Sequence, residues 1–470
     1  MLENLDATVL SRIQFGFTIT FHIIFPAFTI GLSAFIATLE GRWLWTGDDL
    51  YHRLARYWTK IFAISFAMGV VSGIVLSYQF GTNWSRFSVV VGNVIGPLIG
   101  YEVLTAFFLE ATFLGIMLFG WNRVPPWLHF LASVMVAIGT AISAFWILSA
   151  NSWMQSPAGY EMRDGVAHAT DWFAVIFNPT FPYRFAHMVI AAYLTTSIVV
   201  LSVGARHLRR GRFVPESRVM LHMGLGLAAI LAPLQIIIGD FHGIATRDHQ
   251  PAKLAAIEGH WDNDGPAPLV LFGWPNQQAE RNDYELAIPK LGSLIITHDW
   301  EGRFKGLKDF AAVDRPPVWP VFWGFRVMVG LGLAMLALAW VGVFAWWRGR
   351  LDNWRLYLDA ATVAWPAGFL AIVAGWFVTE IGRQPWIATG ILRTADAASP
   401  VPAHVVATSL AAFVVVYGVV FAAGIYYINR MIVKGPAPAV TAEEEGVPSR
   451  PLSGALGAAG HAAKTTGGAA

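Results

Sequence analysis

Long apolar segments constrain this chain more than any other feature of its sequence. Nine windows are continuously apolar over about 20 residues, the length that a helix needs to cross a bilayer. They lie at residues 14–39, 61–80, 94–119, 127–150, 184–204, 219–239, 319–347, 356–380 and 405–429. None shows the period-two alternation of barrel strands. Because backbone groups in lipid must be satisfied internally, the sequence predicts an all-α integral membrane protein with about nine transmembrane helices.

The composition supports this class and excludes others. Only 13% of the 470 residues are charged and 56% are hydrophobic, which is not typical of a soluble domain. The formal net charge of +2 is too close to neutral to indicate a nucleic-acid partner. The absence of Cys from the sequence excludes disulfides, Cys-ligated iron–sulfur clusters and covalent c-type haem. Any metal chemistry must therefore use His, Met or carboxylate ligands.

Basic residues in the short loops predict the orientation. The loops after the first, third, fifth and seventh windows are rich in Arg and Lys. These residues are Arg42, Arg53, Arg56, Lys60, Arg123, Arg206, Arg209, Arg210, Arg212, Arg218, Arg348, Arg350 and Arg355. The alternate loops carry far fewer. By the positive-inside rule, we expect the N-terminus outside and the C-terminus in the cytoplasm.

A polar connection at about residues 240–318 is much longer than a normal loop, and loops of this length usually have a function. The predicted orientation places it outside. Within it, residues 251–261 predict a short helix that carries Lys253, Glu258 and His260. Spacing alone favours a solvated cap for this helix.

The C-terminal segment differs in composition from the rest. From residue 435 onward Pro, Ala, Gly and Glu dominate, and such a segment cannot bury enough apolar surface to fold. We expect one transmembrane domain at residues 1–434 and a disordered cytoplasmic tail at residues 435–470.

Ionisable residues inside the apolar windows are informative because a charge at mid-bilayer costs about 2.5–3.5 kcal/mol. His22 and His187 lie in windows one and five, and His129 and His222 lie in windows four and six. A lone His on an apolar helix is more often a packed core residue than a ligand. Taken singly, none of the four establishes a metal site.

Glu102 and Glu110 give a stronger signal. They lie eight residues apart in window three, which on an α-helix corresponds to about 12 Å of rise and roughly 80° of rotation. They can line one side of a path that moves protons or faces a cofactor. The alternative is a pair of protonated structural carboxyls.

Window eight ends with Trp376, Glu380 and Arg383 at positions i, i+4 and i+7 of one helical face. Arg383 can balance Glu380 or pair with a propionate. At the start of window seven, Met328 follows Arg326, and by itself this Met is typical apolar filling.

The predicted topology brings these residues together. His22, Glu102, His187, Arg326 and Met328 all fall in the outer half of the membrane. Glu380 ends its window at the same level, beside the long outer loop. Two His, a Met and carboxylates in a dry layer are typical of haem iron, for which His and Met are a known axial pair.

Three other classes of membrane protein also use buried histidines or carboxylates. A haem–copper oxidase needs about six membrane His, and only about four lie in or near the windows. A proton-coupled transporter would use the carboxylates as a relay, but the sequence lacks the interrupted repeat halves expected of many transporters. A membrane di-haem electron carrier remains, and oxygen consumption distinguishes it from an oxidase.

Seven motifs in order resemble subunit I of the cytochrome bd quinol oxidases. They are SRIQFGFTITFH, YEVLTAFFLEATF, SAFWILSANSWMQ, RFAHMV, KLAAIE, FRVMV and GWFVTEIGRQPW. The resemblance covers nearly the whole chain to about residue 430. It implies a fold of nine transmembrane helices, mostly arranged as two four-helix bundles.

The resemblance implies a role for each candidate residue. His187 and Met328 resemble the axial ligands of a low-spin haem b, with Arg326 close by. His22, Glu102 and Glu380 resemble residues that flank the two other haems, a high-spin haem b and a haem d or a further haem b in its place. Both His22 and Glu380 are expected to be ligands. The remaining implied assignments are Trp376 for electron transfer, Arg383 for cofactor binding, Lys253 and Glu258 for quinol, and Glu110 and Ser143 for proton uptake from the cytoplasm.

The resemblance also implies the reaction and the partners. Quinol is oxidised at the outer face and oxygen is reduced to water, so that charge is separated without a proton pump. The expected partners are a second large membrane subunit, single-span small subunits and membrane lipid. The expected location is a bacterial cytoplasmic (inner) membrane. The long loop resembles the family's short kind, which lacks an insertion in its second half.

Overall fold

The structure, a computed structural model, describes residues 6–436. Within these residues nine helical spans are long and apolar enough to cross a membrane, so the predicted number is confirmed. The spans are Ala7–Thr46, Asp49–Thr82, Ser85–Phe119, Pro126–Gln155, Phe181–Arg209, Val214–His249, Val318–Trp347, Arg355–Ile381 and Ala403–Lys434. Most extend beyond their apolar windows, because polar residues continue the helices at both ends.

Seven spans are single helices and two are composite. The single helices are α1 (Ala7–Thr46), α2 (Asp49–Thr82), α5 (Pro126–Gln155), α7 (Phe181–Arg209), α8 (Val214–His249), α11 (Val318–Trp347) and α15 (Ala403–Lys434). The third span joins α3 (Ser85–Glu102), the π-helical segment η1 (Val103–Phe107) and α4 (Phe108–Phe119). The eighth joins α12 (Arg355–Val363) and α13 (Ala367–Ile381).

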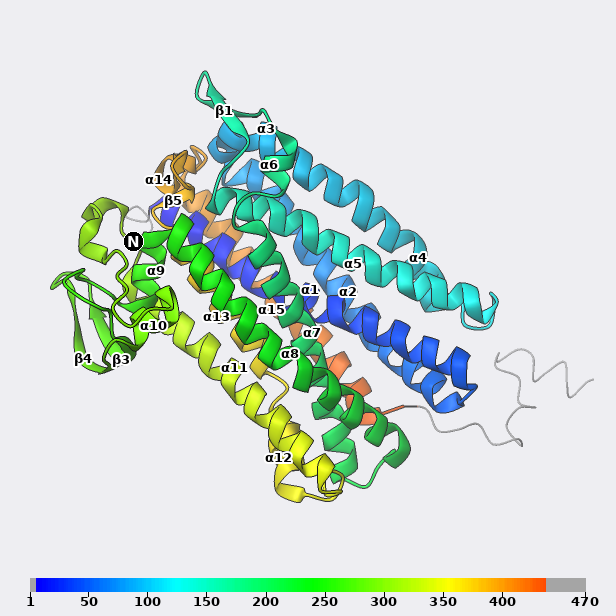
Figure 1. The fold of residues 1–470 in the computed structure, drawn as a ribbon. Coiled ribbons are helices and arrows are strands. Elements are labelled where there is room, and N and C mark those ends of the chain that lie inside the picture. The colour runs from blue at the N-terminus through cyan, green and yellow to red at the C-terminus, as the bar shows by residue number, and fades with distance from the viewer. Residues whose placement is uncertain (1–5, 437–470) are drawn as a thin grey trace, which may run out of the picture. The chain divides into compact units, whose positions relative to one another are not determined.

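The spans pack as two groups of four, which confirms the expected arrangement. In the first group α1 packs against α2 and α5, and the α3–α4 span packs against α5 (Figure 1). In the second group α8 packs against α7 and α11, while α13 packs against α11 and α7. The α1 and α7 helices form the seam between the groups, and α15 packs against α1 and α2.

The short elements lie in the connections. The helices are α6 (Trp172–Ile176), α9 (Pro251–Glu258), α10 (Leu291–Thr297) and α14 (Thr394–Ala397), with the 3-10 turns η2 (Leu307–Asp309) and η3 (Ala312–Asp314). Three antiparallel ribbons pair β1 (Tyr160–Arg163) with β2 (Val166–Ala169), β3 (Leu269–Asn276) with β4 (Arg281–Ile288), and β5 (Trp386–Ala388) with β6 (Leu392–Arg393).

The long loop contains the short helix that the sequence predicts, and this helix ends earlier than expected. The α9 helix stops at Glu258 because Gly259 adopts a left-handed conformation with φ of 64°. A Cβ at Gly259 would also lie 2.9 Å from the ring of Phe322. Only glycine therefore fits this turn without displacing α11. We call the side of the helices that carries α9 the loop end.

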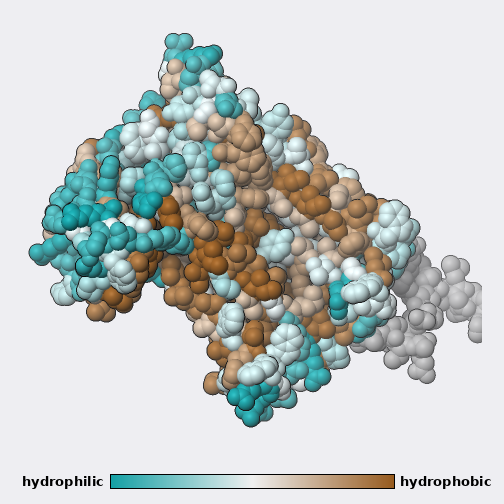
Figure 2. All heavy atoms as spheres, in the orientation of Figure 1, coloured by the Kyte–Doolittle hydropathy of each residue, from teal (hydrophilic) through white to brown (hydrophobic). Residues whose placement is uncertain are grey.

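Apolar side chains cover the helices between polar regions. On the face drawn in Figure 2, the middle of the helices is brown, whereas the loop around β3 and β4 and the turn before α12 are teal. This pattern is the one expected for helices whose solvent is lipid. The predicted tail at residues 435–470 lies outside the described residues except for its first two positions, and the proposed domain limit stays a prediction.

Candidate functional site

Glu380, near the end of α13, lies in a network of amide and charged side chains. Its Oε1 accepts hydrogen bonds from Asn151 Nδ2 at 2.9 Å and from Gln155 Nε2 at 3.4 Å. Its Oε2 forms an ion pair with Arg383, one of the two alternatives that the sequence left open. Arg383 lies just beyond the helix rather than on its face. Both oxygens are therefore satisfied, as a buried carboxylate requires.

The end of α5 connects this carboxylate to two further cations. Asn151 Oδ1 accepts a hydrogen bond from Arg184 of α7. Gln155 Oε1 accepts from Lys253 Nζ at 2.5 Å and from Gln250 Nε2 at 2.9 Å. Asn151, Gln155 and Arg184 were missed as site residues by sequence reasoning. For Asn151 and Gln155, the sequence did contain a signal: two amides four residues apart at the end of an apolar window lie on one helical face.

Lys253 of α9 is buried, with 5% of its surface exposed. Its stem packs on Gly382, where a Cβ would lie 2.8 Å from Lys253 Cγ. Burial lowers the pKa of the Lys253 amine well below its ordinary value; Arg184 acts in the same direction and Glu380 in the opposite one. The amine is therefore a weak base that joins α9 to the Glu380 network.

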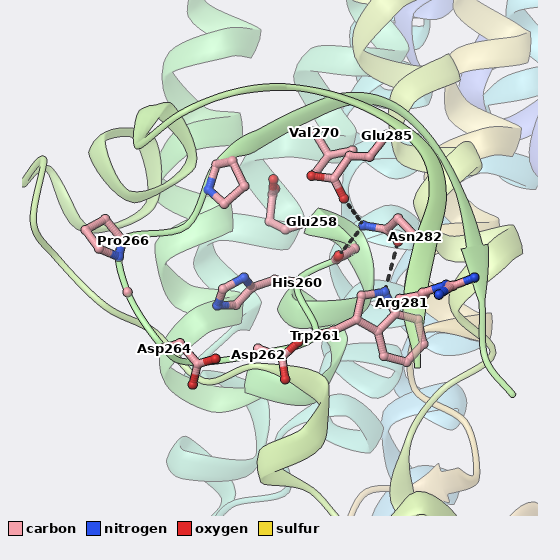
Figure 3. Close-up of a pocket in the computed structure, with 13 residues that line it drawn as sticks. Glu258, His260, Trp261, Asp262, Asp264, Pro266, Val270, Arg281, Asn282 and Glu285 are labelled. Atoms are coloured by element: carbon pink, nitrogen blue, oxygen red, sulfur yellow. Dashed lines mark hydrogen bonds between the residues drawn. The ribbon is translucent and has the colours of Figure 1, made fainter. Parts of the chain in front are cut away.

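Glu258 does not share the surroundings of Lys253, because the two lie five residues apart on α9. Glu258 lines a separate cavity of about 340 Å³ within the long loop (Figure 3). Only 4% of its surface is exposed, and its Oε2 has no hydrogen-bond partner among the described residues. Burial raises the pKa of the Glu258 carboxyl, and the charge of Arg326 opposes this shift. Of the two predicted quinol residues, the structure brings only Glu258 to this cavity.

Arg326 of α11 fastens the loop to the helices. Its guanidinium donates to the backbone carbonyls of Ile257 at 2.8 Å, Val270 at 2.5 Å and Phe322 at 3.0 Å. It also lies 3.2 Å from the centroid of the Phe322 ring. These bonds tie the last turn of α9 and the strand β3 to α11, a role that the sequence did not predict. The expected role of Arg326 near a haem stays a prediction.

His187 and Met328 occupy the second helix group, on two helices that each pack against both α8 and α13. His187 of α7 faces Gly239 of α8, where a Cβ would lie 3.5 Å from its ring. Met328 of α11 faces Gly375 of α13, where a Cβ would lie 2.7 Å from Sδ. His187 Nδ1 is buried without a hydrogen-bond partner among the described residues. Helix-bundle cores are common sites for cofactors held by facing side chains, so this donor pair fits a haem.

His22 lies on α1 in the first group. Its Nδ1 is 3.0 Å from Ser72 Oγ, and the Ser72 hydroxyl itself donates to the Met68 carbonyl at 2.8 Å. With its own proton on that carbonyl, the hydroxyl is placed to accept a hydrogen bond from Nδ1–H, and in this tautomer Nε2 carries the free lone pair. A histidine that ligates a metal is typically held at its other nitrogen in this way. His22 thus also fits a haem ligand.

Trp376 of α13 lies where α13 packs against α1 and α7. It packs against a buried cluster formed by Ile23 and Ala27 of α1 and Ile372 of α13, at the seam of the two helix groups. Its Nε1 is buried without a hydrogen-bond partner in the described part of the chain. The position fits the predicted role between cofactors.

His129 and His222, the other two histidines of the apolar windows, are hydrogen-bonded to carboxylates. His129 Nδ1 is 2.8 Å from a carboxylate oxygen of Glu40, and His222 Nε2 is 2.9 Å from a carboxylate oxygen of Asp352. These partners satisfy the imidazoles, in agreement with the general expectation for a lone His on an apolar helix.

Glu102 and Glu110 are separated by a π-helical segment that the sequence did not reveal. A π turn holds more residues than an α turn, so η1 reduces the rotation of roughly 80° expected on a regular helix. Ser143 Oγ of α5 donates to Glu102 Oε1 at 2.7 Å. Glu110 packs on Gly139 of α5, and its Oε1 has no hydrogen-bond partner among the described residues. The structure therefore turns both carboxyls toward α5.

The fold and these side chains define a class of protein. It is a multi-span membrane protein with haem-type donors in its helix groups, two carboxyls along one span that form no ion pair among the described residues, and an acidic cavity at the loop end.

Comparisons with known proteins agree with this class. The sequence profile of the family described as cytochrome bd terminal oxidase subunit I matches residues 10–436. The chain is 38% identical to cytochrome bd ubiquinol oxidase subunit 1 of Bacillus subtilis (strain 168), over 91% of this chain and 94% of that one. It is 34% identical to cytochrome bd-II ubiquinol oxidase subunit 1 of Escherichia coli (strain K12), over 92% and 97%. A solved structure of bd oxidase from Geobacillus thermodenitrificans superimposes with a TM-score of 0.85 at 33% identity, over 92% of this chain and 100% of that one.

The chain therefore belongs to the cytochrome bd terminal oxidase subunit I family. It is a multi-pass bacterial membrane protein, an oxidoreductase subunit of respiratory electron transport that works with haem.

Proposed function

We propose that this chain oxidises quinol in the loop cavity and reduces oxygen to water within its helix groups, as the main subunit of a quinol:oxygen oxidoreductase. The observation that carries the proposal is the joint placement of His187 and Met328 around one helix group and of Glu258 in the neighbouring loop cavity. His187 and Met328 are side chains of the kind that hold haem iron. Glu258 is a buried carboxyl that can accept a proton at the loop end.

Each donor has a role in this proposal. His187 and Met328 would hold a low-spin haem b. His22 and Glu380 would hold the two others, a high-spin haem b and a haem d or further haem b, with Glu102 beside them. When bound, the haems supply electron transfer and oxygen reduction. Arg383 forms an ion pair with Glu380, Arg184 adds a second positive charge through Asn151, and Trp376 lies at the seam of the two helix groups.

The chain's own carboxyls move the protons. In the cavity, Glu258 Oε2 accepts a proton from a quinol hydroxyl. On the α3–α4 span, Glu110 and Glu102 pass protons toward the oxygen site, and Ser143 orients Glu102 through its 2.7 Å hydrogen bond. Quinol protons leave outside and oxygen's protons come from the cytoplasm, so charge is separated without pumping. Each charge that crosses contributes about 2.3 kcal/mol per 100 mV.

The proposal includes a setting. The distribution of Arg and Lys in the loops supports an N-terminus outside and a C-terminus inside, in a bacterial inner membrane. A second large membrane subunit, single-span small subunits and lipid would cover exposed apolar side chains such as Val415, Val419 and Ile425 of α15.

A reduced-minus-oxidised absorption spectrum with pyridine haemochrome analysis tests the cofactors. Low-spin b bands with a far-red chlorin band are expected if haem d is present, and b bands alone if haem b replaces it. Met328→Leu should remove the low-spin bands and leave the fold intact. Met335→Leu is the matched control, because Met335 is buried two turns further along α11 in an apolar cluster. Survival of the low-spin bands in M328L contradicts the axial pair, and assembled protein without haem contradicts the oxidase.

The quinol site needs a separate test. Glu258→Ala should slow oxygen consumption with quinol by about a hundredfold, within the range of general acid–base effects. It should spare oxygen consumption with an artificial reductant that carries no protons. Equal losses with both donors would remove Glu258 from the quinol site.

A further inference from the structure

The loop cavity contains a second unpartnered proton acceptor beside Glu258. His260 follows α9 by two residues, and its Nε2 is buried without a hydrogen-bond partner among the described residues, as is Oε2 of Glu258. Both side chains line the same cavity of about 340 Å³ (Figure 3). Because buried polar atoms normally have partners, two such atoms at one cavity indicate a ligand that carries two polar groups.

A fixed turn holds the two acceptors at the cavity. The left-handed conformation of Gly259 separates Glu258 from His260, and Asn282 of β4 braces the turn. Asn282 Nδ2 donates to the Gly259 carbonyl at 2.8 Å, while Trp261 Nε1 donates to Asn282 Oδ1 at 2.9 Å. The acceptors are thus preorganised by backbone and amide bonds rather than by the ligand.

The ionisable side chains that line the cavity become more exposed along the chain from Glu258 to Asp264. Glu258 is buried, His260 is half-buried, and Asp262 and Asp264 are exposed. In Figure 3 His260 lies between Glu258 on one side and Asp262 and Asp264 on the other. A proton that reaches His260 therefore has carboxylates beyond it on the way out of the cavity.

The charges around His260 set its protonation. Burial lowers the pKa of His260; a hydrogen bond to the Phe304 backbone opposes this shift, as do Asp262, Asp309 and Glu285. The remaining charged groups near the cavity and the adjacent η2 turn are Glu258, Asp264, Arg281 and Lys308, the last in an ion pair with Asp262 at 2.6 Å. Near neutral pH the imidazole is therefore uncharged and able to accept a proton.

We propose that His260 is the second proton acceptor in quinol oxidation and delivers its proton to the exposed carboxylates at the cavity mouth. Oxidation of a quinol to a quinone breaks two O–H bonds and releases two electrons, which bound haems would accept one at a time. One proton forms a bond with a carboxylate oxygen of Glu258, and the other forms a bond with His260 Nε2. This assignment rests on the proposed oxidation of quinol in this cavity.

The test compares substitutions of His260 in the assembled enzyme. His260→Gln should reduce kcat/KM for quinol by about tenfold or more, while turnover with a proton-free artificial reductant stays at the wild-type level. His260→Glu should restore quinol oxidation, since it supplies another proton acceptor. His249→Gln is the matched control, because His249 is exposed and does not line the cavity.

The pH profile distinguishes proton transfer from a structural role. Glu258 and His260 must both be deprotonated to accept protons, so log kcat/KM of the wild type should fall toward acid pH with a limiting slope of about two. H260Q should lower this slope to about one. A merely structural role would reduce the rate and leave the slope unchanged.

The outcomes separate the two proposals. Wild-type enzyme that consumes oxygen with the artificial reductant but not with quinol contradicts the proposed function. Wild-type enzyme that oxidises quinol, together with an H260Q variant of unchanged rate and slope, overturns the role of His260 alone. Loss of turnover in H260Q that H260E fails to restore, with the acid slope unchanged, also overturns it.

Discussion

Two buried carboxylate sites in this protein are built in opposite ways. Glu380 at the loop end has partners for both oxygens, including the guanidinium of Arg383. Glu110 on α4 has an oxygen without a hydrogen-bond partner, and among the described residues neither Glu110 nor Glu102 forms an ion pair. Within residues 6–436, the side-chain hydrogen bond to this pair comes from the hydroxyl of Ser143 to Glu102.

Under the proposed function, this difference separates haem binding at Glu380 from proton transfer at Glu110. A buried charge that is balanced by cations stays fixed in place, as a ligand must be, and removing it leaves the cations unpaired. A carboxyl without a cation exchanges its proton with little change in its surroundings, as a proton carrier must. The first site should therefore support stability, whereas the second should support turnover.

The largest expected effect is on stability at the first site. Glu380→Gln leaves Arg383 and Arg184 buried without a counter-ion, which should lower the free energy of unfolding by about 3–5 kcal/mol. Unfolding of the purified protein in a denaturing detergent titration measures this, and haem content is expected to fall in parallel.

Glu161→Gln is the matched control for Glu380, because Glu161 forms an ion pair with Arg163 at the exposed ribbon β1–β2. Exposed pairs contribute about 0–1 kcal/mol. If E380Q and E161Q were equally stable, the contrast between a fixed and an exchangeable carboxylate would not hold.

The next effect is on turnover at the second site. Glu110→Gln leaves no cation without its counter-ion, because Glu110 forms no ion pair among the described residues. The free energy of unfolding should therefore change by less than about 1 kcal/mol. Oxygen consumption with saturating quinol should nevertheless fall by about a hundredfold, as expected when a proton carrier is lost. If E110Q lost as much free energy of unfolding as E380Q but consumed oxygen at the wild-type rate, Glu110 would be a structural carboxyl.

The smallest effect concerns the hydroxyl that orients Glu102. Ser143→Ala removes one hydrogen bond, which should cost about 0.5–1.5 kcal/mol of stability and slow oxygen consumption severalfold. Ser149→Ala is the control on the same helix, since Ser149 Oγ donates to the Ile176 carbonyl at 2.8 Å. Both variants should lose similar stability, and only S143A should lose activity. Equal activities would separate Ser143 from the proton path.

Sequence reasoning found the elements that depend on burial alone. The nine spans follow from apolar length, and Glu102, Glu110 and Glu380 stood out because charge inside an apolar window is costly. The short helix at Lys253 and Glu258 was also predicted, although its end at Gly259 was not. The predicted topology brought His187 and Met328 to the same level of the membrane, and the family resemblance implied that they are the axial pair of one haem.

Sequence reasoning missed features that depend on neighbours far along the chain. Asn151 and Gln155 reach Glu380, and Arg184 reaches Asn151, only because α5 and α13 end at the level where α7 begins. The π-helical segment η1 changes a backbone hydrogen-bond pattern that residue types do not specify. The separation of Lys253 from Glu258, and the presence of His260 in the cavity, depend on how the loop folds over α11.

The sequence by itself determined which solvent surrounds this protein and which residues are too costly to bury without a function. These properties follow from the side chains and the length of each apolar segment, so no knowledge of neighbours is needed. Only the tertiary structure decided which buried charges are balanced and which are free to exchange protons. That distinction is a matter of a few ångströms between atoms on separate helices, because a hydrogen bond or ion pair exists only where the packing brings donor and acceptor within reach.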